Sequence, residues 1–463
     1  MAEMLRFGGG GAPYPRCPRK AEWLAIYRGD APWLAAPGRQ GSGLAAAACA
    51  EAAKLVTAGM EADVSGDAGA AADFMRGSFR DIRSRAELGL ALGGFVLKPY
   101  PLPGGRAGAA FLLPQEYSIL EAGPDGLPSR AVFFDAEPAA GLVRAETHEW
   151  HAATADYAIT NEVHKSDGGL PEGAPLGAGA LRKAARWAGL SERQEPRGAP
   201  GPLFGLFRPA VSCGRAPKGP EGVSFFDRAI PLLRLADLHL SGMEREFRMK
   251  EARICVDSLA LDATRARGRR LPCLEEDLYV TLESDGSAKE TFFQVFSPEI
   301  RTRDYLSAYN KYQQLVEDAL GLMHGTFSAP DVTDRTATAV RESKHRTQAT
   351  VAANRGALKE ALAGALAATA FWRGARPDGM RLSLSFDDSF VRDRREELAD
   401  MLEDVSMGLV RPEAYLSRKY GVTEAEALAM MPEGPQLLRD DRTALTWNRA
   451  ELTGDAAADG GGE

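Results

Sequence analysis

The sequence predicts an α+β protein whose first half contains β-sheet and whose second half is built on long helices. Apolar residues recur at helical spacing up to residue 89, and beyond the Gly93-Gly94 pair the apolar period falls to two. From residue 224 onward, helical stretches enclose one short β-rich insert. A chain of 463 residues is long enough for about three domains. Helices that carry a small β tip suit a subunit of an assembly better than a closed catalytic domain.

The first 210 residues predict a helical start followed by a β region. The first forty residues are rich in Gly and Pro and are typical of an arm that carries a short helix. Apolar spacing predicts helices over about 44–60 and 71–89. Short apolar runs between turn sequences then predict strands at 95–97, 110–113, 117–120, 131–134 and within 146–162. Residues 168–201 are typical of a loop, so 70–210 forms an α+β domain.

The second half predicts two helices around a β insert, then a loop and a long helix. Ser224 and Asp227 resemble a capping box at the start of a helix that runs to about residue 250, with Pro231 as a potential break. Strands are predicted at 253–256, 278–282 and 290–296, with Asp285-Gly286 as the turn between the last two. Further predicted elements are a helix at 303–323, a polar loop at 325–335, a long helix at 336–372, a strand at 381–386, helices within 394–431 and a disordered tail.

Charge and cysteine usage exclude several classes of protein. The net charge of −8 argues against coating nucleic acid by bulk electrostatics, but not against DNA sliding past an acidic wall. Five cysteines without a CxxC pair indicate a reduced, intracellular protein with neither a disulfide framework nor a zinc site. No signal-peptide core and no apolar run of about 18 residues occur, so we expect synthesis in the cytosol and no membrane span.

Motifs that carry chemistry are incomplete. His148 and His151, with His164 further on, lack the zincin spacing of three intervening residues, so we interpret them as structural or surface histidines. The glycines at 177 and 179 lack the third glycine of a dinucleotide loop and indicate a flexible turn. Neither a phosphate-binding P-loop nor a nucleophile elbow occurs. We therefore expect no catalytic residues, no cofactor and no metal.

Three charged groups leave alternatives open. Asp387-Asp388 is either a helix-entry cap, which we favour, or a metal-binding pair of a metal-dependent hydrolase, which is our alternative function. Glu275-Glu276-Asp277 is either a solvated acidic face or an interaction edge. A basic series either contacts phosphates or forms an exposed helix face paired with Glu342 and Glu360. That series comprises Arg335, Arg341, Lys344, His345, Arg346 and Arg355.

Five segments in order carry a resemblance to a known family. They are Leu92-Gly93-Gly94, the stretch 224–247 that ends in Glu246-Phe247, the stretch 335–340, Phe386-Asp387-Asp388-Ser389, and the stretches 408–416 and 420–427. Together they resemble the portal proteins of tailed double-stranded DNA phages, of the type found in siphophages of Gram-positive hosts. The resemblance covers roughly 80% of the chain and rests on the order of the segments, since no single motif is specific.

The resemblance implies a portal fold in a ring, usually of twelve subunits, with an α+β wing, a two-helix stem, a β-rich clip, a tunnel loop and a helical crown. Applied to this chain, it implies an N-terminal arm at 1–39, wing at 40–222 and 373–405, stem helices at 223–251 and 301–324, clip at 252–300, tunnel loop at 325–335, long helix at 336–372, and crown with tail at 406–463.

The resemblance also implies a function without catalysis. The ring would be the channel at one capsid vertex through which double-stranded DNA is packaged and ejected, independently of its sequence. Its implied partners are further copies of itself, the terminase large subunit, a head-completion or adaptor protein, and the major capsid and scaffolding proteins, with no membrane. Its location would be the virion, and the host cytoplasm during assembly.

Two sets of residues are predicted to act in that function. The channel and tunnel-loop residues are Thr326, Phe327, Ser328, Asp331, Thr333, Arg335, Arg341 and Lys344. The partner-docking residues of the clip are Glu275, Glu276, Asp277 and Asp285. A polar loop nearly free of cations would touch the duplex softly and obstruct its back-slippage, because each added Lys or Arg at the bore deepens phosphate binding.

Overall fold

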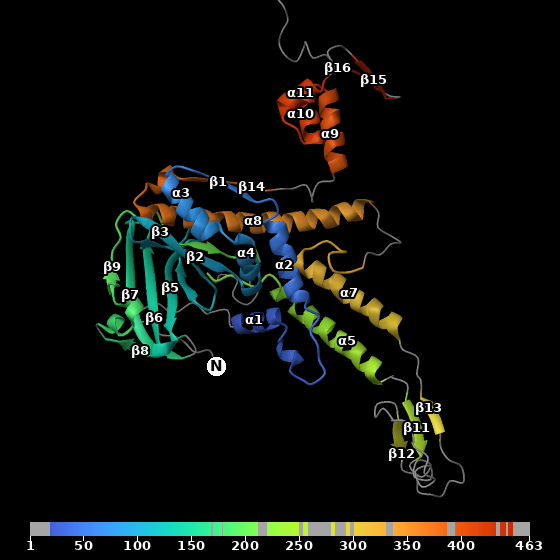
Figure 1. Ribbon diagram of the computed structural model, residues 1–463, viewed down its shortest axis with the longest axis horizontal. Coiled ribbons are helices and arrows are strands. Elements are labelled where there is room, and N and C mark those ends of the chain that lie inside the picture. The colour runs from blue at the N-terminus through green and yellow to red at the C-terminus, as the bar shows by residue number, and fades with distance from the viewer. Residues whose placement is uncertain are drawn as a thin grey trace, which may run out of the picture. The chain divides into compact units, whose positions relative to one another are not determined.

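The computed structural model shows a mixed protein, 49% helical and 22% strand, which confirms the predicted α+β class (Figure 1). It describes residues 19–167, 170–177, 179–211, 220–249, 253–257, 279–282, 293–296, 301–329, 337–386, 394–431, 436–440 and 443–447. The chain divides into two compact units, Met1–Ser385 and Phe386–Glu463. In the described part of the chain, no helix combines the length and the apolar character needed to cross a membrane.

Alanine-rich packing builds the N-terminal helical layer. Helix α1 (Lys20–Arg28) places Trp23 fully in the core, and α2 (Leu44–Val56) buries Ala45, Ala48, Ala52 and Ala53. These alanines recur three, four and one residues apart on one face, and their small side chains let α2 approach α4 (Ile82–Leu92) closely. The helix predicted within the N-terminal arm is therefore part of the core from residue 20 onward.

The predicted single helix over 71–89 was wrong. The segment is α3 (Ala68–Phe74), a π-helical turn η2 (Met75–Phe79) and then α4, with a break where Asp81 adopts a φ of +57°. A side chain at Gly77 would contact Ala109, so the π turn brings the backbone close to a neighbouring strand. Arg85 donates to the carbonyls of Gly77 and Ser78 and so satisfies acceptors that the break frees.

Two antiparallel sheets follow the helical layer, in the region where the alternating pattern predicted strands. The larger sheet has the order β4-β5-β6-β7-β8, with β9 also paired to β7, and the smaller has the order β10-β2-β3. Their strands are β2 (Phe95–Leu102), β3 (Arg106–Leu112), β4 (Tyr117–Ala122), β5 (Pro128–Glu137), β6 (Leu142–His151), β7 (Asp156–Asp167), β8 (Leu170–Leu176), β9 (Arg193–Gln194) and β10 (Gly205–Phe207). Strands β8 and β9 lie where a loop was predicted, because Pro and Gly hide the edge strand β8.

Helix α8 (Ala337–Arg373) is the long helix that the sequence predicts, and Figure 1 shows it crossing the N-terminal unit. It lies against β2 and β10 at very short range. A side chain at Gly205 would sit 1.9 Å from the carbonyl oxygen of Ala361, so only glycine fits there. After α8, the predicted strand β14 (Arg381–Ser385) pairs antiparallel with β1 (Glu61–Ser65) and returns the chain to the N-terminal helices.

The predicted helices around the β insert are present as α5 (Ile230–Met249) and α7 (Thr302–Leu320). Pro231 does not break α5, because it lies in the first turn, where the backbone N–H has no intrahelical acceptor. The insert contains β11 (Arg253–Asp257), β12 (Tyr279–Leu282) and β13 (Phe293–Phe296). Strands β12 and β13 flank β11 on opposite sides, so they do not pair with each other. The proposed turn Asp285-Gly286 lies outside the described residues.

The C-terminal unit is helical with one hairpin. It contains α9 (Arg394–Ser406), α10 (Pro412–Tyr420), α11 (Glu424–Ala429) and the antiparallel pair β15 (Gln436–Asp440) and β16 (Thr443–Trp447). Thr423 and Glu426 form a complete capping box at the start of α11. The unit starts at Phe386, and the hairpin was not predicted.

Candidate functional site

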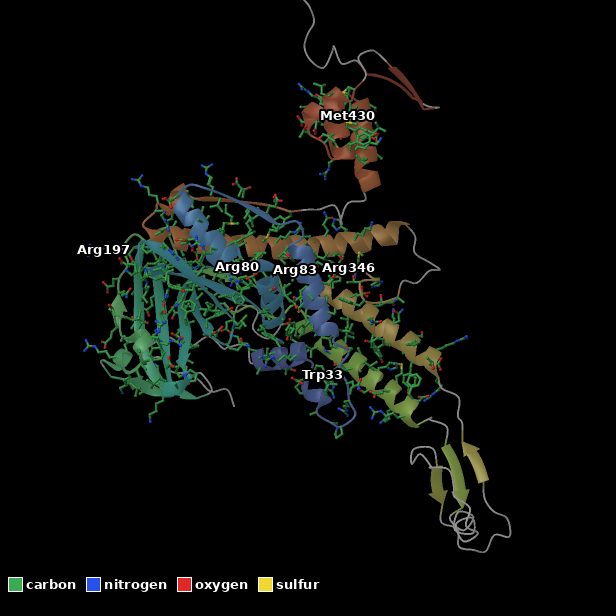
Figure 2. The ribbon with its side chains drawn as sticks, in the orientation of Figure 1. Trp33, Arg80, Arg83, Arg197, Arg346 and Met430 are labelled. Atoms are coloured by element: carbon green, nitrogen blue, oxygen red, sulfur yellow. The ribbon has the colours of Figure 1, made fainter. Side chains whose placement is uncertain are left out.

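Helices α5 and α7 form an antiparallel pair that carries the β insert between them. His239 of α5 lies between two tyrosines of α7. Its Nε2 is 2.9 Å from the carbonyl oxygen of Tyr305, and its ring centroid is 5.4 Å from that of Tyr312. The N-terminal segment reinforces α5, since Asp237 accepts from the Nε1–H of Trp33 (Figure 2) and from the backbone N–H of Ser42. His239 therefore joins the two helices, and Asp237 ties α5 to the N-terminal segment.

A bidentate ion pair closes α5 and α7 at the end where the insert leaves them. The Arg301 Nη2 donates to Glu246 Oε2 at 2.8 Å, and its Nε donates to Oε1 at 3.2 Å. The hydrogen bond to Glu246 raises the pKa of Arg301. The planar guanidinium matches the carboxylate fork, so the pair sets the relative register of the two helices as well as joining them.

Large apolar side chains remain exposed on α5 and α7 and just beyond them. Leu306 is 53% exposed and Leu235 is 47% exposed, and Phe247 and Met323 are also exposed. Single exposed apolar side chains are ordinary on protein surfaces, and these four lie on one helix pair or just beyond it.

Residues 325–329, the described part of the predicted tunnel loop, lie against α7. Ser328 is only 5% exposed, and its hydroxyl donates to Glu317 Oε2 at 2.8 Å. Phe327 packs against the apolar core, and the Thr326 hydroxyl donates to the carbonyl oxygen of Met323 at 2.6 Å. In this conformation Ser328 is bound internally rather than offered to a ligand. Asp331, Thr333 and Arg335 lie outside the described residues.

The basic series on α8 is divided between several positions. Arg346, near the end of α8 that adjoins α7 (Figure 2), pairs with Asp318. Arg355 donates to the carbonyl oxygens of Leu55 and Val56, and so binds the C-terminal carbonyls of α2. The side chain of Glu342 lies outside the described ones, so the pairing with Glu342 that the sequence suggested stays a prediction. Lys344 is half-buried, and Arg341 lies in α8 with its side chain outside the described ones.

Asp318 links α7, the loop and α8. It accepts from Nε2 of His324 at 2.8 Å as well as from Arg346. Burial opposes its charged form, but the hydrogen bonds from Arg346 and His324 hold the pKa of this carboxyl below its usual range. Thr350 of α8 also donates to the carbonyl oxygen of Gly321, the residue that ends α7. The junction between α7 and α8 is therefore tied at more than one point.

The acidic candidates fall outside the part of the chain that the structure describes. They are Glu275, Glu276, Asp277 and Asp285 of the insert, together with Asp387 and Asp388. Where the structure describes the chain, no three His, Cys, Asp or Glu side chains come together in a metal-binding arrangement.

His148 lies in a buried polar network that the sequence did not reveal. On β6, its Nε2 is 2.7 Å from Glu146 Oε1, and its Nδ1 is 2.7 Å from the Tyr157 hydroxyl. A carboxylate only accepts, so Nε2 carries the proton; Nδ1 then accepts from Tyr157, whose oxygen accepts from the backbone N–H of Leu203. Burial lowers the pKa of His148, which favours this neutral form. His151 lies exposed at the end of the strand.

Two cations complete the network around Glu146. Glu146 Oε2 pairs with the Lys98 ammonium at 2.7 Å and with the Arg144 guanidinium at 2.8 Å. Burial would raise the pKa of Glu146, but Lys98, His148 and Arg144 together hold it well below its usual value of 4.5. Arg144, Glu146 and His148 alternate along β6 and therefore face the same side. That alternation is visible in the sequence, but it is equally typical of a solvated strand face.

The network borders a cavity of about 540 Å³ between the strands and the end of α8. Aromatic side chains line it together with the polar ones, among them Tyr100, Phe133, Trp187 and Trp372. Arg144 and Lys98 on its wall are both engaged with Glu146, and Trp187 Nε1 donates to Asp135 at 2.8 Å. Two buried donors on its wall, Arg144 Nε and Trp372 Nε1, have no hydrogen-bond partner among the described residues.

Comparison of the chain with models of known protein families gives no match, and comparison with curated protein sequences gives none either.

Proposed function

We propose that this chain is a phage portal protein, a ring subunit through whose central channel double-stranded DNA enters and leaves a capsid. The observation that carries the proposal is the order of elements from α5 to α8. An antiparallel helix pair bears a small three-stranded sheet, and a loop folded against the second helix leads into a helix of 37 residues. That order matches the stem, clip, tunnel loop and long helix of the family that the sequence resembles.

The apolar side chains left exposed on the helix pair support assembly into a ring. In a ring, each subunit offers two different surfaces, and the contact closes by rotation. Leu235, Phe247 and Leu306 would then be covered by the neighbouring subunit, which removes their apolar area from water. The Glu246–Arg301 pair keeps the two helices in one register, as a repeated contact requires.

The charge of the chain suits a channel that does not hold its cargo. A net charge of −8 per subunit makes a ring strongly acidic, and an acidic wall repels the phosphates of the duplex. Arg346 and Arg355, two cations of the basic series, are engaged with protein groups. Binding energy to DNA would therefore stay low and salt-dependent, as sliding requires. The insert 252–300 would dock the terminase and later an adaptor protein.

The test is the mass of the purified protein by light scattering, with negative-stain images of the same peak, alone and co-produced with a scaffolding protein. We expect annular particles of about twelve protomers in at least one condition. A monomer in both conditions at high concentration contradicts the proposal.

A pair of variants connects the ring to the helix surface. Leu306→Glu places a charge on the exposed face of α7 and should shift the mass toward the monomer. The matched control is Leu127→Glu, a leucine of similar exposure (49% against 53%) in the turn between β4 and β5, which should leave the ring intact. If both variants keep the mass of the ring, the exposed face of α7 is not part of the contact between subunits.

A further inference from the structure

Glu317 is a buried carboxylate whose partners all belong to the loop that follows its own helix. Its side chain is 0% exposed. Oε1 accepts from the backbone N–H of Phe327 at 2.6 Å and of Ser328 at 2.9 Å. Oε2 accepts from the Ser328 hydroxyl at 2.8 Å and from the backbone N–H of Gly325 at 3.3 Å. Four donors therefore converge on one carboxylate.

The number of donors explains why this position carries a carboxylate. An ionised Glu has about four acceptor sites and no donor, so it matches four converging donors. A Gln at this position would turn an N–H₂ group toward N–H and O–H groups that also donate. Among the described residues, the buried charge is stabilised by loop donors rather than by a Lys or Arg. Glu317 and the loop segment thus depend on each other.

A second side chain of α7 fastens the far end of the same segment. Asn310 lies two turns before Glu317 on the helix, and its Oδ1 accepts from the backbone N–H of Ala329 at 2.7 Å. Gly325, with a φ of +90°, provides the turn that sends the chain back along α7. Residues 325–329 therefore run beside α7 and are held at both ends.

We propose that Glu317 is the positioning residue of the tunnel loop: it fixes residues 325–329 on α7 and so sets where the loop leaves the helix. The role in the channel rests on the proposed portal function, whereas the anchoring itself does not. Glu317 touches no ligand and acts through the loop. Thr326, whose hydroxyl is bound at the surface of this segment, is held in place by the residues on either side of it.

The anchoring is measured by hydrogen exchange with mass spectrometry on peptides that cover 322–329 in the full chain. Glu317→Gln should speed the exchange of this segment about tenfold or more, because hydrogen bonds to a charged acceptor are lost. The matched control is Asp304→Asn, an exposed acidic residue of the same helix, which should leave exchange unchanged. Unchanged exchange in Glu317→Gln overturns the proposal.

If Glu317→Gln does not fold, Ser328→Ala replaces it as the test variant for hydrogen exchange. It removes one donor to Glu317 and the acceptor of the Gly325 N–H while keeping all loop amides, so we expect a smaller acceleration over the same peptides. Exchange as slow as in the wild type contradicts the anchor, because the hydroxyl would then contribute nothing to it.

The functional arm separates the two proposals. If the wild type forms rings, Glu317→Gln should form them too but lose packaged DNA faster than Asp304→Asn does. If Glu317→Gln exchanges faster but its rings retain DNA as well as those of Asp304→Asn, the position of the loop has no role in DNA retention. Accelerated exchange in a protein that never forms rings would contradict the portal function and leave the anchor standing.

Discussion

The N-terminal sheet and the α7–loop junction each bury a carboxylate, and they satisfy it in opposite ways. Glu146 lies between two cations and a neutral histidine, all on strands of one domain. Glu317 receives backbone N–H groups and one hydroxyl from a loop. The Glu146 network joins side chains of two sheets. The Glu317 side chain instead holds a backbone segment in place.

The difference lies in what is left when the carboxylate is removed. Without Glu146, the buried Lys98 loses its counter-charge and Arg144 keeps only the longer contact to Asp135, so two cations are left underpaired inside the domain. Without Glu317, the loop N–H groups can turn toward water, because the loop lies at the surface. We therefore expect the same substitution to act globally at one site and locally at the other.

Glu146→Gln should have the largest effect. Removing one partner of a buried ion pair costs about 3–5 kcal/mol, because Lys98 stays buried without a carboxylate and Arg144 keeps only Asp135, at 3.4 Å. The measurement is urea unfolding followed by tryptophan fluorescence, which reports on the first unit because, of the six tryptophans, only Trp447 lies beyond Ser385. The control is Glu149→Gln on the outer part of the same strand, where a loss under about 1 kcal/mol is expected. Equal losses would mean that the Glu146 network contributes no more than a surface pair.

Lowering the pH should reduce the free energy of unfolding in two steps, through His148 and then through Glu146. Burial lowers the pKa of His148 from 6.5, so the unfolded chain binds a proton before the folded one does, and stability falls as the pH drops below about 6.5. The pKa of Glu146 is also held low in the folded state, so its contribution is present above about 4.5 and is lost as the pH falls further.

Unfolding free energies of the wild type and Glu146→Gln, measured from pH 7.5 down to 3.5, check this assignment. The difference between the two proteins should shrink below about pH 4.5, where the carboxylate protonates in the unfolded state. A difference that stays constant down to pH 3.5 would contradict a role for the Glu146 charge.

Elements with a strong local pattern could be predicted from the sequence. Helices α2, α5, α7 and α8 and strands β4 and β5 carry periodic apolar residues, and the structure confirms these elements within a few residues. The break between α3 and α4 was missed because both helices bury the same kind of face, so the apolar period passes through the π turn. The pairing of β1 with β14 joins segments more than 300 residues apart, and no local pattern reports such a contact.

The polar contacts were even harder to predict, because they too depend on residues that are distant in the sequence or on backbone groups. His148 attracted notice as a possible metal ligand, whereas its partners lie on other strands or two residues along its own. The alternation of Arg144, Glu146 and His148 was visible, but it resembles an ordinary solvated strand face until a second sheet covers it. Glu317 had no signal at all, because its donors are mostly backbone groups, which every sequence contains.

The smallest effect on global stability should come from Glu317→Gln. This variant best tests whether the two buried carboxylates act differently. Loop amides that lose a charged acceptor can bind water after a local opening, so we expect about 1–2 kcal/mol in urea unfolding, well below the loss in Glu146→Gln. The same two variants should rank in the reverse order for hydrogen exchange at residues 322–329. A loss in Glu317→Gln as large as that in Glu146→Gln would mean that the loop is part of the cooperative core, and that its anchor holds the helix pair together and not only the loop.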